Sequence, residues 1–333
     1  MTSEHRIRKE IQFLRAVAVT LVVLSHLSIG RFSGGFVGVD MFFVVSGFVI
    51  GLTMVNEQIS SGKVSFKRFF ERRFFRIFPP LSFMVVVMTV YAYFIVPFIK
   101  AQDFFIQQAR AALFSYGNFF FMFRKLNYFV QSGDITFFLH TWSLGVEEQF
   151  YIALPLVLGV LALIGRRFDA SRRIRIWTIG FSVLGLASAF TMYGASNEKF
   201  GWFTPSFRQE FLFYSPFTRA WEFFLGLLVA IAVVRYEQGS KYLGSAVRTT
   251  LAATAVAIIA YVLITRVDGN GTQIVACALT ALATGLLIFS LPGSKLDVQK
   301  FFGLRAFQAI GNSSYSIYLW HWIGVSISID LMR

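Results

Sequence analysis

The chain contains 333 residues, of which 56% are hydrophobic and 14% are charged, and its formal net charge is +14. Soluble domains carry about 25% charged residues, so this composition excludes an ordinary soluble protein and predicts a helical membrane protein. The single cysteine, Cys277, excludes a disulfide framework and a thiolate metal site, and we interpret it as a small core residue.

Apolar runs of around twenty residues recur along the chain, and each is long enough to cross a bilayer core of about 30 Å. They predict an all-α bundle of nine to ten membrane spans in one domain over 1–333. The expected spans lie near 11–29, 36–55, 77–99, 139–164, 175–194, 214–234, 249–265, 272–291 and 310–329. The stretch 103–125 is amphipathic, and two interpretations stay open: a helix at the membrane interface, or a segment that enters the membrane and returns.

The basic residues predict the orientation of these spans. With a cytoplasmic N-terminus, the cytoplasmic segments contain Arg6, Arg8 and Lys9; Lys67, Arg68, Arg72, Arg73 and Arg76; Arg166, Arg167, Arg172, Arg173 and Arg175; Arg235, Lys241 and Arg248; and Lys295, Lys300 and Arg305. The intervening loops carry fewer basic residues, as the positive-inside rule requires. Topology therefore explains the positive charge, and we expect no nucleic-acid partner.

The first predicted span contains a cation and an imidazole. Arg15 and His26 are eleven positions apart, and at about 100° per residue this spacing places both side chains on one helix face. Such groups are costly in lipid and usually line a polar path. In the simpler interpretation, Arg15 marks the cytoplasmic helix end and His26 makes a structural hydrogen bond. We favour a functional pair, because a glycine-rich bend follows at once.

This bend, at residues 34–38, contains three glycines, which allow a tight turn and a close approach between backbones. Asp40 follows at the start of the second predicted span. Two roles stay open for Asp40: it complements the helix dipole, or it orients the imidazole of His26 across the bend. The Ser46-Gly47 pair downstream predicts close packing between helices.

A cluster of basic and aromatic residues precedes Pro79 and Pro80, which we expect to fix the entry into the next span. Arg73 and Arg76 are three positions apart and share one face of a predicted helix. One interpretation is a positive-inside anchor with aromatic belt residues. The functional interpretation is a guanidinium pair for the phosphate oxygens of a cofactor, which arginine binds bidentately.

Two adjacent acids, Glu147 and Glu148, lie near the start of the predicted span 139–164. A single acid at a helix start is ordinary, but adjacent side chains point about 100° apart. We therefore expect Glu147 to face the bundle and to take part in the polar path, and we leave the role of Glu148 open. We interpret His140 as a loop residue near the interface. His321 lies in the middle of a predicted span, and we favour a structural hydrogen bond over a second polar lining residue.

Five motifs occur in order along the chain: Arg15, ten residues, then His26; Gly35-Phe36-Val37-Gly38-Val39-Asp40 and the apolar run after it; Arg73-Phe74-Phe75-Arg76; Trp142-Ser143-Leu144-Gly145-Val146-Glu147-Glu148-Gln149-Phe150-Tyr151; and Tyr315 to Trp322. Together they resemble acyltransferase family 3, whose integral membrane O-acyltransferases modify envelope carbohydrates in bacteria. The resemblance covers nearly the whole chain.

The resemblance implies an enzyme of the bacterial inner membrane. It would take an acyl group, usually acetyl from cytoplasmic acetyl-CoA, to a sugar hydroxyl on or beyond the outer face. Acceptors in the family include lipopolysaccharide O-antigen, exopolysaccharide and peptidoglycan. The family's Arg/His pair maps to Arg15 and His26, its cofactor-linked Arg-x-x-Arg pair to Arg73 and Arg76, and its motif acid to Glu147.

The chain departs from the family pattern at its end. In the family, a further helix with a Glu-x-Pro-x-Arg pattern normally follows the Leu-Trp-His-Trp span. Family members whose sequence around the His140 position is similar carry a C-terminal periplasmic SGNH esterase-like domain. Two expectations therefore stay open: a complete acyltransferase domain over 1–333, or one that lacks this final helix and this C-terminal domain.

These residues predict acyl transfer at a buried imidazole. His26, oriented by Asp40 or Glu147, would act as general base for the sugar hydroxyl, or would itself carry the acetyl group. Arg15 would stabilise the thioester end or the developing oxyanion. We favour direct transfer. Two rival classes stay open: a transporter or channel without chemistry, and an acyl carrier that feeds a separate transferase.

Overall fold

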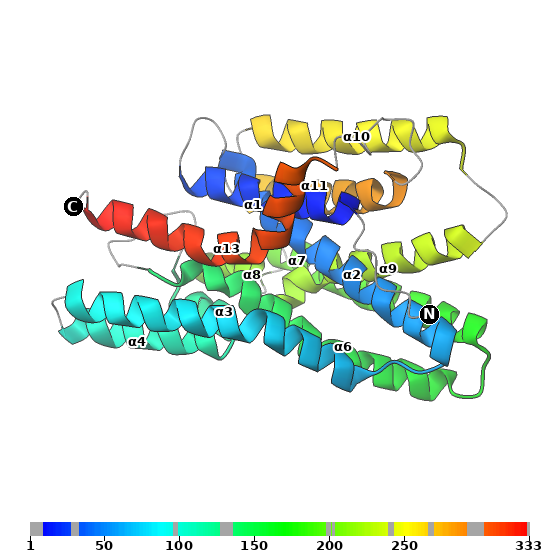
Figure 1. Ribbon diagram of the computed structural model, residues 1–333, viewed down its shortest axis with the longest axis horizontal. Coiled ribbons are helices and arrows are strands. Elements are labelled where there is room, and N and C mark those ends of the chain that lie inside the picture. The colour runs from blue at the N-terminus through cyan, green and yellow to red at the C-terminus, as the bar shows by residue number, and fades with distance from the viewer. Residues whose placement is uncertain are drawn as a thin grey trace. The chain divides into compact units, whose positions relative to one another are not determined.

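The structure is a computed structural model that describes residues 9–27, 33–95, 99–126, 136–197, 201, 204–238, 243–265, 270–291 and 303–331. The helices are α1 (Lys9–His26), η1 (Ser33–Val37), α2 (Gly38–Ser61), α3 (Phe66–Ile95), α4 (Ile99–Leu113), α5 (Gly117–Phe123), η2 (Leu139–Thr141), α6 (Trp142–Gly165), α7 (Ala170–Ser196), α8 (Pro205–Tyr214), α9 (Pro216–Gln238), α10 (Ser245–Ile264), α11 (Asn270–Ser290) and α13 (Arg305–Leu331) (Figure 1). The described ranges contain no strand, so the all-α prediction is confirmed.

Seven helical stretches in the described part of the chain are long and apolar enough to cross a membrane: Gly34–Ser61, Phe66–Phe94, Leu139–Gly165, Ala170–Ser196, Phe207–Tyr236, Ser245–Ile264 and Gly271–Ser290. The protein is therefore a multi-pass membrane protein. The expected spans 11–29 and 310–329 fall on α1 and α13, which are helical but are not among the seven. In α1 the reason is charge, because its 18 residues include Lys9, Glu10 and Arg15.

The helices cluster into two compact units. The first consists of Met1–Ser60 and Glu222–Tyr318, and the second of Ser61–Trp221 and Leu319–Arg333. Helices α9 and α13 each contribute to both units. Residues far apart in sequence therefore belong to the same unit.

In the first unit, glycines let α2 and α9 approach at backbone distance. Gly47 and Gly51 are four positions apart and face Phe223 and Leu227. A Cβ atom at Gly47 would overlap the carbonyl oxygen of Phe223 and come within 2.9 Å of its Cα. Small residues at this spacing are typical of close helix pairs in membranes. The packing predicted for Ser46-Gly47 is therefore present on the Gly47 side.

Helix α1 is held in the first unit at both ends. The bend of η1 lies against its C-terminal half, where a Cβ atom at Gly35 would come within 2.9 Å of the Cβ of Ser25. At the other end, the Nε2 of Gln308 in α13 donates to the carbonyl oxygen of Lys9 at 3.0 Å. Helices α10 and α11 lie side by side in the same unit (Figure 1).

In the second unit, α3 continues through both prolines. Pro79 and Pro80 lie inside the helix, and the basic stretch that begins at Phe66 forms its first turns. The expected start of this span near residue 77 is therefore corrected: the helix begins eleven positions earlier. Prolines inside membrane helices are tolerated where neighbouring groups satisfy the released carbonyls.

The amphipathic stretch 103–125 folds into α4 and α5, separated by a turn in which Ser115 has a φ of +55°. Helix α4 has 15 residues, or about 22 Å, and α5 has 7, so neither is long enough to span a bilayer. Helix α4 packs beside α3 (Figure 1). Helix α5 contacts α6 and α8. The stretch is thus a short helical pair packed on the second unit.

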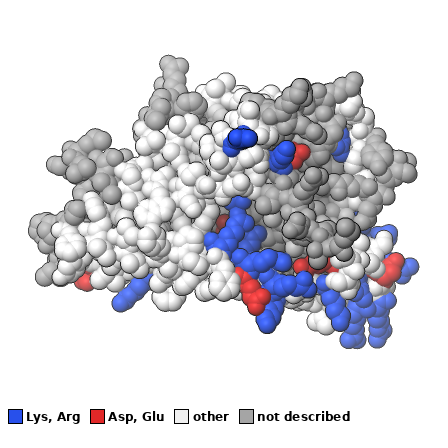
Figure 2. All heavy atoms as spheres, viewed as in Figure 1, with Lys and Arg blue, Asp and Glu red and all other residues white. Residues whose placement is uncertain are grey.

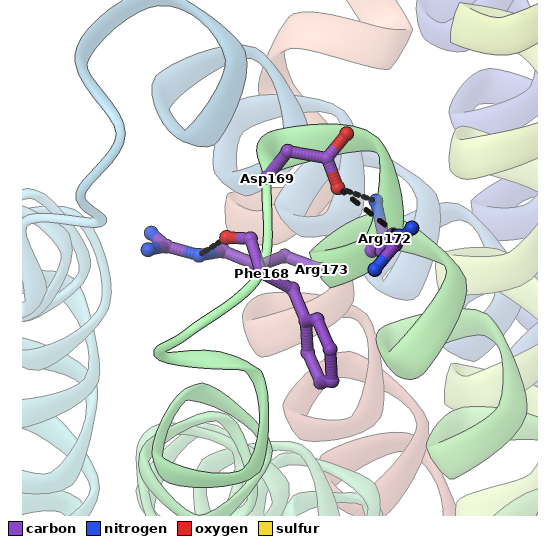
Figure 3. A network of polar contacts seen from close by, with 4 residues as sticks. All are labelled: Phe168, Asp169, Arg172 and Arg173. Atoms are coloured by element: carbon purple, nitrogen blue, oxygen red, sulfur yellow. Dashed lines mark hydrogen bonds and ion pairs between the residues drawn. The ribbon is translucent and has the colours of Figure 1, made fainter.

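A capped turn connects α6 to α7. Asp169 is the N-cap of α7, and its carboxylate accepts from the backbone N–H of Arg172 at 3.2 Å (Figure 3). The Nε of Arg173 donates to the carbonyl oxygen of Phe168 at 3.0 Å, which ties the turn to the helix start. Asp at an N-cap satisfies an otherwise unpaired N–H group, so the sequence itself determines where α7 begins.

On the surface of the second unit, charged and apolar side chains lie on different parts of the helices. Exposed cations gather at the start of α3 and around the α6–α7 turn, while much of the remaining visible surface is uncharged (Figure 2). Large apolar side chains are exposed elsewhere on these helices, among them Phe83, Phe94, Leu156 and Leu186. Apolar exposure on this scale fits contact with lipid. Of the basic residues expected in the cytoplasm, Arg6, Arg8, Lys241, Lys295 and Lys300 lie outside the described residues.

Candidate active site

Arg15 and His26 lie in one continuous helix, α1. Between them, Val19 and Val22 complete a helical stripe, and these two valines are buried while Arg15 and His26 are half-buried. A stripe with buried members faces protein and not lipid. The first unit therefore holds a guanidinium and an imidazole on an inward-facing surface, where a polar group can act.

Asp40 is fully buried in the first turn of α2. Gly38 faces α1, because a Cβ atom there would come within 2.8 Å of the side chain of Val22. At about 100° per residue, Asp40 lies about 200° from Gly38, on the face that Gly47 presents to α9. Both roles predicted for Asp40 stay predictions: an acid at the positive helix end, or the group that orients His26.

In the second unit, Glu147 is joined to Arg73 through Tyr151. The Nη1 of Arg73 donates to the Tyr151 hydroxyl at 3.2 Å, and that hydroxyl donates to Oε1 of Glu147. The Arg73 guanidinium also lies 4.6 Å from the centroid of the Tyr151 ring. The structure thus brings together two residues predicted separately, and it adds a tyrosine to which the sequence analysis gave no role.

Arg73 and Arg76 do not share an environment. Arg73 is half-buried against α6, whereas Arg76 is exposed. The exposed face of α3 instead carries arginines spaced by four positions, at Arg68, Arg72 and Arg76. This exposed stripe is the larger guanidinium surface, and three cations on one face suit a ligand with several phosphate groups.

A pair of imidazoles in the second unit was not predicted from the sequence. The rings of His140 and His321 lie 5.7 Å apart, and the ring of Trp322 stacks on His140 at 6.1 Å. The Nε1 of Trp322 donates to the carbonyl oxygen of Thr136 at 2.6 Å, which fixes the indole. His140 is fully buried and lies in η2, so its interpretation as a loop residue is corrected.

A pair of side-chain amides fastens α5 to α6. The Nδ2 of Asn118 donates to Oε1 of Gln149 at 3.1 Å, and the Nε2 of Gln149 donates to Oδ1 of Asn118 at 2.7 Å. Each amide also donates to a backbone carbonyl, that of Tyr214 from Asn118 and that of Ser115 from Gln149. Because Gln149 follows Glu147 in the same motif, this pair holds the helix that carries the acid.

Replacing Asn118 with leucine should destabilise the protein by about 2–3 kcal/mol, because the half-buried amide of Gln149 then loses two hydrogen bonds and the buried carbonyl of Tyr214 loses one, while shape is nearly kept. Thermal unfolding in detergent measures this change. The matched control is Gln107→Leu, since the exposed hydrogen bond between Gln107 of α4 and Arg124 at the end of α5 contributes about 0.5 kcal/mol or less. Equal unfolding temperatures for both variants would contradict the expectation.

The described residues contain no group of three His, Cys, Asp or Glu side chains that could hold a metal ion. Cys277 is buried, in keeping with a core position. The ionisable groups described above are imidazole, guanidinium, carboxylate and phenol groups inside a helical membrane protein. These ionisable groups inside the membrane domain place the chain in the class of polytopic membrane proteins that have a buried polar site.

A family model described as an acyltransferase domain matches residues 8–333. Because this match covers nearly the whole chain, the chain belongs to acyltransferase family 3, and the resemblance noted in its motifs is confirmed. No solved structure matches the chain.

Two relatives carry names that specify a reaction. The chain is 28% identical over 324 residues to the peptidoglycan O-acetyltransferase OatA of Listeria monocytogenes, covering 96% of this chain and 50% of that protein. It is 27% identical over 318 residues to the O-acetyltransferase OatA of Staphylococcus aureus, covering 93% of this chain and 49% of that protein. The chain thus spans about half the length of these curated relatives.

Proposed function

We propose that the protein is an O-acetyltransferase of the bacterial inner membrane that moves acetyl from cytoplasmic acetyl-CoA to a hydroxyl of an envelope carbohydrate. The observation that carries the proposal is the inward-facing Arg15–His26 stripe in a member of this family. Peptidoglycan is the first acceptor to test, because one relative is named for it. Lipopolysaccharide O-antigen and exopolysaccharide are the alternatives.

The chemistry follows from His26. Its imidazole takes the proton of the sugar hydroxyl as the oxygen attacks the thioester carbonyl, and returns that proton to the thiolate of CoA as the carbon–sulfur bond breaks. In the second version, one imidazole nitrogen attacks the thioester carbonyl, and CoA leaves as the thiol with the proton of the other ring nitrogen. The sugar hydroxyl then attacks the acetyl group, and its proton returns to the displaced imidazole. Arg15 stabilises the oxyanion in both versions. We favour direct transfer.

The donor's phosphates need cations on the cytoplasmic side. With the N-terminus in the cytoplasm, the start of α3 is cytoplasmic, and there Arg68, Arg72 and Arg76 form the exposed stripe. We assign the CoA phosphates to this stripe. Of the arginine pair expected from the sequence, Arg76 belongs to it. A further C-terminal domain, as expected from the family, would extend the protein on the other side of the membrane.

Acetyl transfer tests the function. Membranes that contain the protein receive radiolabelled acetyl-CoA with peptidoglycan fragments, lipopolysaccharide or no acceptor, and label is counted in the carbohydrate. We expect transfer to one carbohydrate class. No label in any carbohydrate, with the protein intact in the membrane, would overturn the proposal and favour a transporter.

The phosphate assignment makes a separate prediction. The double change Arg72→Ala and Arg76→Ala should raise the KM for acetyl-CoA about 10-fold with kcat within about twofold, because charged hydrogen bonds to phosphate are lost and the reacting groups are not. Arg175→Ala, an exposed arginine of α7, is the matched control and should leave KM unchanged. An unchanged KM in the double variant would contradict the assignment.

A further inference from the structure

The hydroxyl of Tyr151 lies between Arg73 and Glu147. Its side chain is buried at 1% exposure in α6, and the ring of Phe69 in α3 packs edge-on against it at 6.0 Å. Arg73 donates to the hydroxyl, and the hydroxyl donates to Glu147. A phenol has one proton to give and lone pairs to receive one, so it can satisfy a cation and a carboxylate at the same time.

The charge around Arg73 argues against a phosphate at this guanidinium. Glu147 and Glu148 both interact electrostatically with Arg73, so two acidic side chains already lie close to this cation. A phosphate that approached Arg73 would meet these two acids, and repulsion between like charges is strong where water is scarce.

We propose that Tyr151 is a positioning residue of the transferase, through which Arg73 holds the carboxylate of Glu147 in place for the reaction. The inference rests on the proposed acetyl transfer. It gives the two arginines of the Arg-x-x-Arg motif different roles: Arg73 holds Glu147 in place, and Arg76 binds the phosphates of acetyl-CoA. Glu147 and Tyr151 are four positions apart on α6, so the helix presents both to α3.

The decisive variant is Tyr151→Phe, which keeps the ring and its contacts with Arg73 and Phe69 and deletes only the hydroxyl. We expect kcat to fall about 10- to 100-fold, because a misplaced catalytic group loses its alignment, while the KM for acetyl-CoA stays within about twofold. The pH profile of kcat should also shift, since the acid loses its donor. The full chain in membranes is used, with the acceptor that the transfer assay identifies.

Two comparisons separate positioning from simple stability. Tyr214→Phe is the matched control, because that buried hydroxyl in the same unit donates to the carbonyl of Leu126 at 2.8 Å. It should lower thermal stability about as much as Tyr151→Phe and leave kcat and the pH profile unchanged. The double variant Tyr151→Phe, Arg73→Lys should have a kcat no lower than that of the worse single variant. Both changes break the same chain of contacts from Arg73 through Tyr151 to Glu147.

Each outcome decides the proposal. A Tyr151→Phe protein with the wild-type kcat and pH profile overturns it, and so does a variant in which only the KM for acetyl-CoA rises. If the fold-decrease in kcat of the double variant equals the product of the two single decreases, the proposal is also overturned, because Arg73 would then act independently of Tyr151. If wild-type protein transfers no acetyl to any carbohydrate, the proposed function fails and this inference fails with it.

Discussion

Replacing His26 with glutamine should reduce acetyl transfer by at least about 1,000-fold. Glutamine keeps polarity and approximate size but can neither take up a proton near neutral pH nor accept an acetyl group. The half-buried position of His26 on a stripe with Val19 and Val22 places the lost group on the protein-facing side of α1. The measurement is label transferred from acetyl-CoA to carbohydrate per unit of protein in the membrane.

The matched control for this change is Thr20→Ala. Thr20 lies on the same helix but is exposed, so its loss should leave transfer within about twofold of the wild type. Trapping with hydroxylamine after removal of free acetyl-CoA then separates the two chemical versions, because a protein-bound acetyl-imidazole would yield labelled hydroxamate before any acceptor is added. Full activity in His26→Gln would eliminate both versions.

Replacing Gly47 with alanine should destabilise the first unit by about 3 kcal/mol. The added Cβ atom would overlap the carbonyl oxygen of Phe223, and backbone atoms cannot move aside as a flexible side chain can. Helices α2 and α9 would have to separate, and packing contributes most of the association between helices in lipid. Thermal unfolding of purified protein in detergent measures the effect.

Gly159→Ala is the control for the loss of a glycine inside a helix. Gly159 lies in α6 with no atom within 4 Å of an added Cβ, so alanine there should be neutral or stabilising by about 0.5–1 kcal/mol. Because Gly47→Ala should lower the stability and Gly159→Ala should not, the difference between them measures the effect of the close contact between α2 and α9. A Gly47→Ala protein as stable as the wild type would show that α2 and α9 do not approach this closely.

The sequence predicted the elements better than their ends. Composition and apolar periodicity were sufficient for the all-α membrane class, because a chain in lipid must satisfy its backbone groups within helices. The start of α3 was misplaced because Pro79 and Pro80 predict a helix boundary, whereas the structure continues the helix through them. Local residue preferences cannot show which neighbours satisfy the released carbonyls.

The site was predicted in separate pieces. Arg15 and His26 share a face because helical geometry alone determines it, and both lie in α1 as expected. The four-residue spacing of Glu147 and Tyr151 also places them on one helix face. The hydrogen bond between Tyr151 and Arg73 could not be predicted from the sequence, because it joins two separate helices. No spacing rule relates His140 to His321, which are separated by most of the chain.

The sequence by itself determined that this protein is helical and resides in a membrane, that it belongs to an acyltransferase family, and which polar residues are costly enough in lipid to indicate function. Only the tertiary structure decided that Arg73 turns toward Tyr151 and Glu147 while Arg76 remains exposed, and that His140 is buried against His321. The physical reason is that periodicity specifies a face of one helix, whereas the partner of that face depends on how separate helices pack.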